Sequence, residues 1–324
     1  MSLFKYILGG LGLLETGKVI KEIDDNIIYV IDRKTGNKCR EKINPFLRYS
    51  LATLYQTKNG PKLSSKKIID ATEKYGIKYD DPKSAEKIPE FVKFFDIDMT
   101  QFTPSDISEY PHFNSFFYRK LKKNVRKSET NFVVCPADSR VMVFESISEA
   151  TKIWIKGDHF SMEKLLGPVL CKQYKEASIA IFRLAPQDYH RFHSPVSGTV
   201  TSIGPLLGKE YYSVNPIAIN SKTDVFGNNK RKILKIATKK YDQILYIPIG
   251  ATLVGSINLT VKKGSPVSRI KEIGYFAFGG SSVICVFKKD KITFDSDLLQ
   301  NSKTGFETLV KLGESLGTWR NKNK

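Results

Sequence analysis

The stretch YFAFGGSSVICVFKK, residues 275–289, consists of two apolar runs joined by two glycines and two serines. Runs rich in Val, Ile and Phe predict buried β-strands, and a Gly-Gly pair between two such runs predicts a β-hairpin. Ser281 and Ser282 open the second run, where valine would suit a buried strand better. Two hydroxyls directly after the most permissive backbone in the chain mark this turn as a candidate site of chemistry.

Short runs of the same kind fill the chain from about residue 131 onward, separated by glycine, proline and polar turns. They are NFVVCPAD (131–138), RVMVFES (140–146), SIAIFRLAP (178–186), SGTVTSIG (197–204) and QILYIPIGATLVGSI (243–257). The segment 301–317, which also contains polar residues, is expected to be loop or short helix. These patterns predict a strand-rich body of mostly antiparallel sheets.

The first part of the chain has helical features. Segment 63–76 has serines at its start and a glycine at its end, as helices often do. In segment 85–98, Pro89 suits a first helical turn, and one apolar face is predicted from i, i+3, i+4, i+7 spacing. That face consists of Ile88, Phe91, Val92 and Phe95. We therefore expect an α+β fold in which a helical N-terminal portion, residues 1–126, packs on a strand-rich catalytic region, residues 127–324.

The chain is strongly basic, with 52 Lys and Arg against 33 Asp and Glu and a net charge of +19. Such a charge indicates an anionic partner, which could be nucleic acid, a phospholipid surface or an acidic substrate. No paired-Cys zinc site or RNA-binding aromatic signature is present, so we expect no nucleic acid. Four separated cysteines without a CxxC pair are typical of a reducing, intracellular compartment.

The longest apolar run near the start, residues 6–14, is too short for a membrane-spanning helix, which needs about 20 residues. It can serve as an interfacial anchor, or it can pack on the body of the protein. The aromatic and basic segment 113–126 offers the same two alternatives. Both segments are therefore candidates for membrane contact, and neither predicts a membrane span.

His190 and His193 stand three residues apart in RLAPQDYHRFHSPVSG (183–198). Such a pair can bind a metal, pack structurally or transfer protons. No further His or Cys cluster supplies the other ligands of a zinc site, so we expect no metal.

Asp138 follows an apolar run, where it can orient an imidazole or simply form a turn. The G-x-S-x-G motif of serine hydrolases is absent around Ser281. A triad therefore requires that the fold gather these residues.

Several long segments, taken in order, resemble the phosphatidylserine decarboxylases, a family of pyruvoyl enzymes. They are WIKGDHFSMEKLLG (154–167), RLAPQDYHRFHSPVSG (183–198), YYSVNPIAIN (211–220), IGATLVGSI (249–257) and GYFAFGGSSVICVF (274–287). The resemblance extends from about residue 113 to residue 317, and more weakly back to residue 88. The Gly-Gly-Ser-Ser form of the serine motif is most similar to the second, endomembrane-type branch of the family.

The resemblance implies that the chain is a proenzyme that cuts itself between Gly280 and Ser281. The products would be a β chain, residues 1–280, and an α chain, residues 281–324, whose Ser281 becomes a covalent pyruvoyl cofactor. By the same resemblance, His193 activates Ser281 and Asp138 orients His193. His190 is implied as proton donor or substrate contact, and Ser282 as support for the turn geometry.

One residue departs from the family pattern: Ser139 stands where many members have glycine and some have cysteine. A small side chain is retained, so we expect Asp138 to keep its role.

The implied reaction is the decarboxylation of phosphatidylserine to phosphatidylethanolamine, with the pyruvoyl group as electron sink. The metal reading of His190 and His193, as a metal-dependent hydrolase, is then a weaker alternative. A lipoyl-type carrier wants a lysine at the hairpin tip, where this chain has serines.

The implied partners are phosphatidylserine and the anionic phospholipid membrane that contains it, together with the α and β chains of one precursor. We expect an intracellular, peripheral membrane protein, on endomembranes in a eukaryote or on the inner face of the cell membrane in a bacterium. A homodimer is compatible with the sequence. The alternative function is that of a catalytically inactive lipid-binding homologue. That alternative predicts loss of Asp138, His193 or Ser281, and all three are present.

Overall fold

The computed structural model describes residues 27–43, 74, 76–129, 133–153, 160–221, 223–239, 242–251, 256–277, 279 and 281–320. Several predictions fall outside these residues and have no structural account here. They are the apolar run 6–14, nearly all of the expected helix at 63–76, and Gly280.

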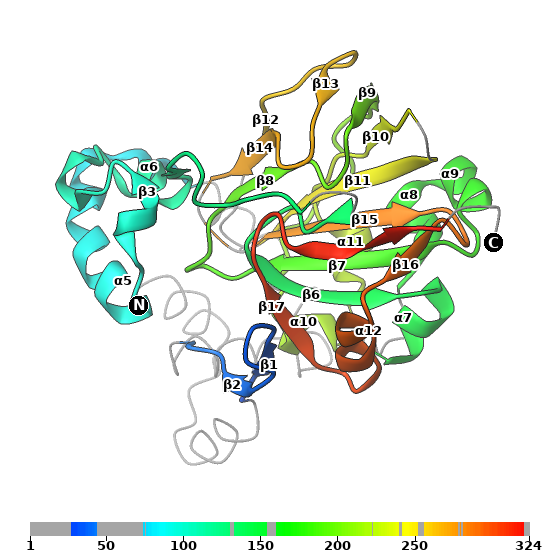
Figure 1. Ribbon diagram of the computed structural model, residues 1–324. Coiled ribbons are helices and arrows are strands. Elements are labelled where there is room, and N and C mark those ends of the chain that lie inside the picture. Colours follow the sequence, from blue (N-terminus) through cyan, green and yellow to red (C-terminus); the bar gives the residue numbers. More distant parts are fainter. Residues whose placement is uncertain are drawn as a thin grey trace, which may run out of the picture.

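A ten-stranded sheet forms the centre of the molecule (Figure 1). Its strands are, in spatial order, β13 (Pro266–Val267), β9 (Gly198–Ile203), β10 (Leu234–Ala237), β11 (Gln243–Gly250), β15 (Ser281–Phe287), β7 (Ser178–Leu184), β6 (Ser139–Phe144), β17 (Glu307–Val310), β1 (Tyr29–Asp32) and β2 (Lys38–Arg40). Among these described strands all pairs are antiparallel except β1 with β17, which are parallel. The strand-rich body of mostly antiparallel sheets is thus confirmed.

Three smaller sheets and several helices surround the large sheet. The small sheets are β12 (Ile257–Leu259), β14 (Glu272–Phe276) and β8 (Arg191–His193); β16 (Ile292–Phe294), β18 (Ser315–Trp319) and β5 (Val133–Val134); and β3 (Phe102–Thr103) with β4 (Lys120–Leu121). The helices are α5 (Ile88–Phe95), α6 (Phe113–Phe117), α7 (Ile147–Ile153), α8 (Met162–Leu166), α9 (Pro168–Gln173), α10 (Pro216–Ile219), α11 (Val225–Asn228) and α12 (Ser296–Lys303). Short 3-10 helices occupy Pro82–Lys87, Met99–Gln101 and Ile107–Glu109.

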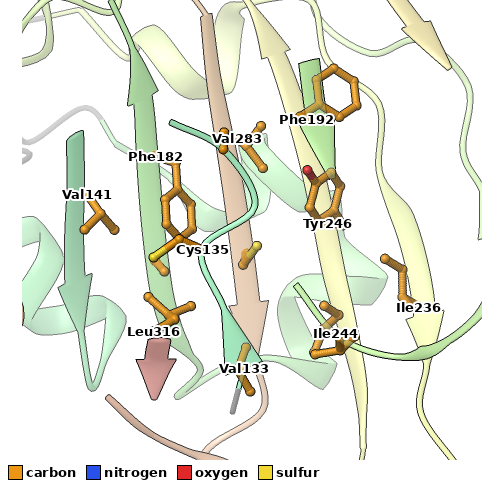
Figure 2. Packing of buried hydrophobic residues seen from close by; sticks show 14 of the residues in the cluster. Val133, Cys135, Val141, Phe182, Phe192, Ile236, Ile244, Tyr246, Val283 and Leu316 are labelled. Carbon is orange, nitrogen blue, oxygen red and sulfur yellow. The ribbon is translucent and has the colours of Figure 1, made fainter. Parts of the chain in front are cut away.

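The central strands β7, β11 and β15 are buried on both faces, which explains their nearly continuous apolar sequences. Successive side chains point to opposite faces, so each strand contributes to two separate cores. Figure 2 shows one of these cores, with Phe182, Val283 and Tyr246 from three neighbouring strands. Phe192 of β8 packs over this face, with its ring 6.2 Å from that of Tyr246. The β8 segment therefore lies against the centre of the sheet.

The predicted hairpin at the Gly-Gly turn is wrong. β14 pairs with β12 and β8, whereas β15 pairs with β11 and β7. The two apolar runs therefore belong to different sheets, joined by residues 277–280. A fully buried strand needs partners on both edges, and β11 and β7 supply them for β15. The turn at Gly279 consequently carries the chain from the covering sheet into the central one.

Segment 301–317 differs in part from its expectation: it holds the end of a helix and loop, as expected, but also the whole of β17 and the start of β18. α12 ends at Lys303, and β17 and β18 follow. Glu307, which reads as a surface residue in sequence, is buried in β17 and forms an ion pair with Arg183 of β7. A charged residue that is paired inside a sheet interrupts the apolar pattern, so the strand cannot be predicted from hydrophobicity.

The N-terminal portion lies at one side of the large sheet, where α5, α6 and β3 are grouped (Figure 1). The predicted apolar face of α5 is confirmed, since Ile88 is buried and Phe91 packs on Phe113 and Phe116. Pro89 stands in the first turn, as expected. A contribution that was not anticipated is the β1–β2 hairpin, which extends the large sheet at its β17 edge.

Candidate active site

Ser281 and Ser282 begin β15, the central strand of the sheet. Ser281 pairs with Gly250 on one side and Leu184 on the other, and both serines are fully buried. Within the described residues, neither hydroxyl has a hydrogen-bond partner. Buried polar groups are normally satisfied, so two orphaned hydroxyls at one place indicate a site of chemistry. Gly279 has a φ of 130°, a conformation that favours glycine, directly before this site.

His190 lies against the turn that precedes Ser281. Its ring is fully buried and stacks on Phe117 of α6, with ring centroids 3.9 Å apart. Its Nδ1 is 2.9 Å from the carbonyl oxygen of Asp188 and therefore carries the proton. Burial lowers the pKa of His190 to about 3, although the Asp188 and Gly279 backbones favour its charged form. The imidazole is neutral, and its buried Nε2 has no hydrogen-bond partner within the described residues.

His193 is the last residue of β8 and is held at both ring nitrogens. Nδ1 lies 2.8 Å from the carbonyl oxygen of Ile270, and Nε2 lies 3.0 Å from the hydroxyl of Tyr189. Burial lowers the pKa of His193, while the charges of Glu272 and Asp138 oppose that shift. This ring is therefore neutral as well, with its tautomer set by a backbone carbonyl.

Asp138 precedes β6 and is almost completely buried. Its carboxylate accepts hydrogen bonds from Arg126 at 3.0 and 2.5 Å and from the backbone N–H of Leu312 at 2.9 Å. Burial alone would raise the pKa of Asp138, but the hydrogen bond from Arg126 and the charge of Lys311 lower it below its usual value. The side chain is ionised and is tied to segments on either side of the expected cut.

The structure links some of the predicted residues in pairs, but among the described residues no hydrogen bond joins Ser281 to His193 or to Asp138. His190 is next to Gly279 by contact, and Asp138 acts on His193 through its charge. Asp138 and His193 do not bind each other directly in these contacts. Asp138 accepts hydrogen bonds from Arg126 and Leu312. The ring nitrogens of His193 bond to Ile270 and Tyr189.

A buried ionic cluster lies on the Ser282 face of the sheet. Arg183, which pairs in register with Ser282, contacts Glu307 and Glu41, and its neighbour Arg140 contacts Glu41 and Asp188. Both arginines lower the pKa of Glu41 against the effect of burial, whereas burial raises the pKa of Glu307. The Arg140 Nε is close to Glu41 but is not aligned for a hydrogen bond. Through Asp188, whose carbonyl binds His190, this cluster reaches the candidate site.

Sequence reasoning missed three residues of the site. Tyr189 stands between Asp188 and His190 and gave no signal of its own, since a tyrosine near an H-x-x-H pair is ordinary. Ile270 acts through its backbone carbonyl, which no side-chain pattern can reveal. A counter-ion for Asp138 could be anticipated from its position after an apolar strand. Nothing in the sequence singled out Arg126 from the other basic residues of its segment.

Two negative observations apply to the part of the chain that the structure describes. In it, no three His, Cys, Asp or Glu side chains come together as a metal site would require. Also within it, every helix is too short or too polar to cross a bilayer.

Comparison with known proteins places these residues in context. Residues 113–318 match the family model for phosphatidylserine decarboxylase. The chain is 46% identical over 302 residues to phosphatidylserine decarboxylase proenzyme 2 of Komagataella phaffii, covering 90% of this chain and 30% of that protein. It is 43% identical over 304 residues to proenzyme 3 of Schizosaccharomyces pombe, covering 91% and 31%. The chain therefore spans about a third of the length of these two relatives.

A bacterial relative is similar over its whole length. The phosphatidylserine decarboxylase proenzyme of Fusobacterium nucleatum is 39% identical over 300 residues, which is 91% of this chain and 98% of that protein. The match to the family model and this end-to-end similarity agree with the resemblance seen in the sequence motifs. The chain belongs to the phosphatidylserine decarboxylase family.

Proposed function

We propose that this chain is a proenzyme that cuts itself between Gly280 and Ser281 and then decarboxylates phosphatidylserine to phosphatidylethanolamine. The observation that carries the proposal is the Ser281 hydroxyl, which is buried and unpartnered at the first position of the central strand. A strand in the core has no structural need for a hydroxyl, and leaving it unsatisfied costs about 1–3 kcal/mol. Its relatives are named proenzymes, which supports a role for this serine in processing.

The proposed cleavage balances in three steps. The Ser281 oxygen attacks the carbonyl carbon of Gly280, and the peptide nitrogen leaves, so that an ester replaces the amide. Loss of the Ser281 α-proton then expels the Gly280 carboxylate and leaves a dehydroalanine. Water converts the dehydroalanine to a pyruvoyl group and releases ammonia. Only a residue with a β-oxygen that can leave gives this product, which accounts for serine at position 281.

His193 and Asp138 have proposed roles in the first step. Neutral His193 is suited to accept the Ser281 proton, because burial keeps its pKa low and Nδ1–H is fixed on a backbone carbonyl. Asp138 is ionised and favours the protonated imidazole through its charge, which would stabilise His193 once it has accepted a proton. We infer that Asp138 acts at a distance and that the Ile270 carbonyl supplies the orientation.

The surroundings of Ser281 fit the proposed cofactor. Its orphaned hydroxyl is the group that processing consumes, and the seven residues of β15 pair with β11 and β7 on both edges. The new N-terminus would therefore remain fixed in the sheet. The pyruvoyl group supplies an electron sink for decarboxylation. His190 is proposed as proton donor or substrate contact through Nε2, which has no hydrogen-bond partner within the described residues.

Further proposals concern the surroundings of the enzyme. An anionic substrate lipid and a net charge of +19 support binding at the surface of an anionic membrane, where each nearby Lys or Arg contributes about 1 kcal/mol. We propose a peripheral, intracellular association through residues 1–126, on endomembranes or on the inner face of the cell membrane. Division into regions 1–126 and 127–324, and a homodimer, stay predictions.

The intact mass of freshly purified protein tests the proposal, with Ser281→Ala purified in parallel. The expected result is two fragments, residues 1–280 and residues 281–324, the latter with a pyruvoyl N-terminus, and one uncut chain for Ser281→Ala. Cut protein should release carbon dioxide from phosphatidylserine in mixed vesicles, and the variant should not. An uncut wild-type chain without this activity would instead favour the inactive lipid-binding homologue.

A further inference from the structure

Tyr189 makes a direct contact with the proposed base. Its hydroxyl oxygen lies 3.0 Å from Nε2 of His193, and the two rings lie with centroids 5.7 Å apart. The side chain is buried and packs in a small cluster with Phe102 and Leu312. Tyr189 thus occupies the nitrogen on which His193 would have to accept the proton of Ser281.

The donors and acceptors in this contact can be assigned. The carbonyl of Ile270 can only accept, so Nδ1 of His193 carries the hydrogen at 2.8 Å. In the neutral ring Nε2 is then an acceptor with one lone pair. Tyr189 must donate to it, since burial raises the pKa of the phenol and keeps it protonated. The Nε2 lone pair of His193 therefore accepts the hydrogen bond from Tyr189. Within the described residues, Ser281 Oγ has no hydrogen-bond partner.

The backbone that fixes this tautomer is itself unusual. Ile270 has a φ of 56°, which is a genuine outlier for a β-branched residue. Two hydrogen bonds hold this turn to Ser194: Ile270 N–H donates to the Ser194 carbonyl at 2.9 Å, and Ser194 N–H donates to the Lys271 carbonyl at 2.8 Å. Strain of this kind persists only where surrounding structure enforces it, and it clusters at functional sites. His193 is therefore held in one tautomer by the fold, and Nε2 is left as its working nitrogen.

We propose that Tyr189 is a positioning residue that restrains self-cleavage by occupying Nε2 of His193. Cleavage requires the Tyr189 hydroxyl to turn away, after which His193 takes the Ser281 proton at the vacated lone pair. The inference rests on the proposed function, because it concerns the same cut between Gly280 and Ser281. It assigns to the tyrosine of the Tyr-His-Arg-Phe-His segment a control over the rate at which the precursor matures.

The proposal has a signature in pH dependence. A donor at Nε2 stabilises the neutral imidazole, so its removal raises the pKa of His193. The other charged groups that act on these two side chains are Glu272 of β14, Asp138, Arg191 of β8 and Arg119. They stay in place in a Tyr189→Phe variant, so the shift reports the lost hydroxyl. A role confined to packing would not move it, because phenylalanine keeps the ring.

The rate of cleavage in freshly synthesised full-length chain tests the proposal. Wild type, Tyr189→Phe and Ser281→Ala are made by cell-free translation with a short radioactive pulse. Conversion to the two fragments is followed by gel at a series of pH values between 5.5 and 8. The matched control is Tyr110→Phe, which removes another buried tyrosine hydroxyl, one that donates to the carbonyl of Pro104.

We expect Tyr189→Phe to cleave about 2- to 10-fold faster than wild type, the range that one lost hydrogen bond allows. Its rate should begin to fall at a higher pH than that of wild type as the solution is acidified. Tyr110→Phe should match wild type in both respects. If Tyr189→Phe does not fold, as judged by thermal unfolding, Tyr189→Met takes its place, because its smaller, flexible side chain is apolar and also lacks a donor.

Two outcomes would overturn the restraint. An unchanged rate with an unchanged acid limb would make Tyr189 a packing residue. A folded variant that no longer cleaves would make its hydroxyl essential for proton transfer. Failure of the proposed function looks different, because the wild-type chain would then remain uncut under all conditions.

Discussion

Ser281 and Ser282 are neighbours in sequence, yet they face two different environments. Ser281 shares its face of the sheet with Val283 and Leu184, under the apolar cover provided by Phe192. Ser282 shares the opposite face with Arg183, at the edge of the buried ionic cluster. One hydroxyl thus lies on an apolar face of the sheet, and the other lies beside charged groups that already bind one another.

The difference separates two tasks within one short strand. An apolar environment leaves the Ser281 hydroxyl without competing partners, which suits a nucleophile used once. A cluster of paired charges fixes segments that are distant in sequence, because Glu41, Arg183 and Glu307 come from three separate parts of the chain. The alternation of a β-strand assigns each serine to its task.

Exchange of each serine for alanine is the most direct way to break this comparison. We expect Ser281→Ala to abolish cleavage completely, since no β-oxygen remains. Ser282→Ala should still cleave, with a rate within about tenfold of wild type, because within the described residues the Ser282 hydroxyl has no hydrogen bond to lose. The mass of protein purified at fixed times after expression measures both. Equal loss of cleavage in the two variants would remove the distinction.

Removal of Arg183 tests the charged face. Arg183→Met leaves Glu41 and Glu307 buried without their shared counter-ion, and we expect the free energy of unfolding to fall by about 3–5 kcal/mol. Urea unfolding of the uncut Ser281→Ala chain measures it. Lys289→Met is the control, because Lys289 forms a solvent-exposed pair with Glu176, and exposed ion pairs contribute little to stability. Similar midpoints for the two variants would contradict the importance of the cluster.

The pH dependence of stability sharpens the comparison near His190. The pKa of His190 is about 3 in the folded chain, well below its ordinary value near 6.5. Between these values the unfolded chain binds a proton that the folded chain does not, so the free energy of unfolding falls with decreasing pH. The expected slope is about 1.4 kcal/mol per pH unit for this group. Between pH 5.5 and 4.5, His190→Gln should show a slope smaller by about that amount. Identical slopes would mean that His190 is charged in the fold.

The smallest expected effect comes from the turn that holds His193. Ile270→Gly has two opposing effects. It relieves the strain of a positive φ, which stabilises the fold, and it adds conformational freedom to the unfolded chain, which destabilises the fold. We therefore expect the free energy of unfolding to change by less than about 1 kcal/mol. Ile273→Gly, at a fully buried position in the adjoining strand, should cost more than about 3 kcal/mol. A large loss at Ile270 would show that its side chain, and not its carbonyl, is what matters there.

Much of the fold could be predicted from local pattern. The runs that became β7, β11 and β15 were recognisable because burial on both faces requires continuous apolar sequence. The partners of those strands were not recognisable. β14 and β15 look like a hairpin in sequence, and only the competition for β11 and β7 separates them. β17 was not predicted, because the buried Glu307 is paired with Arg183, a residue of β7 that is distant in sequence.

The candidate site followed a similar division. The residue types and the two histidines could be identified from motifs, and the structure places His190 beside Gly279. The hydrogen bonds of the site could not be predicted, since they depend on what the fold brings to each atom. Arg126 on Asp138, Ile270 on His193 and Tyr189 on His193 are contacts of this kind.

The strands that follow Ser281 are distributed over two sheets. β15 and β17 belong to the ten-stranded sheet, and β16 and β18 belong to a three-stranded one with β5. A cut before β15 would therefore leave two polypeptides whose strands alternate within the same sheets. Neither polypeptide could then dissociate unless the core unfolded. Recovery from urea would then become a second-order reaction, faster at higher protein concentration. The uncut Ser281→Ala chain would recover at a rate independent of concentration.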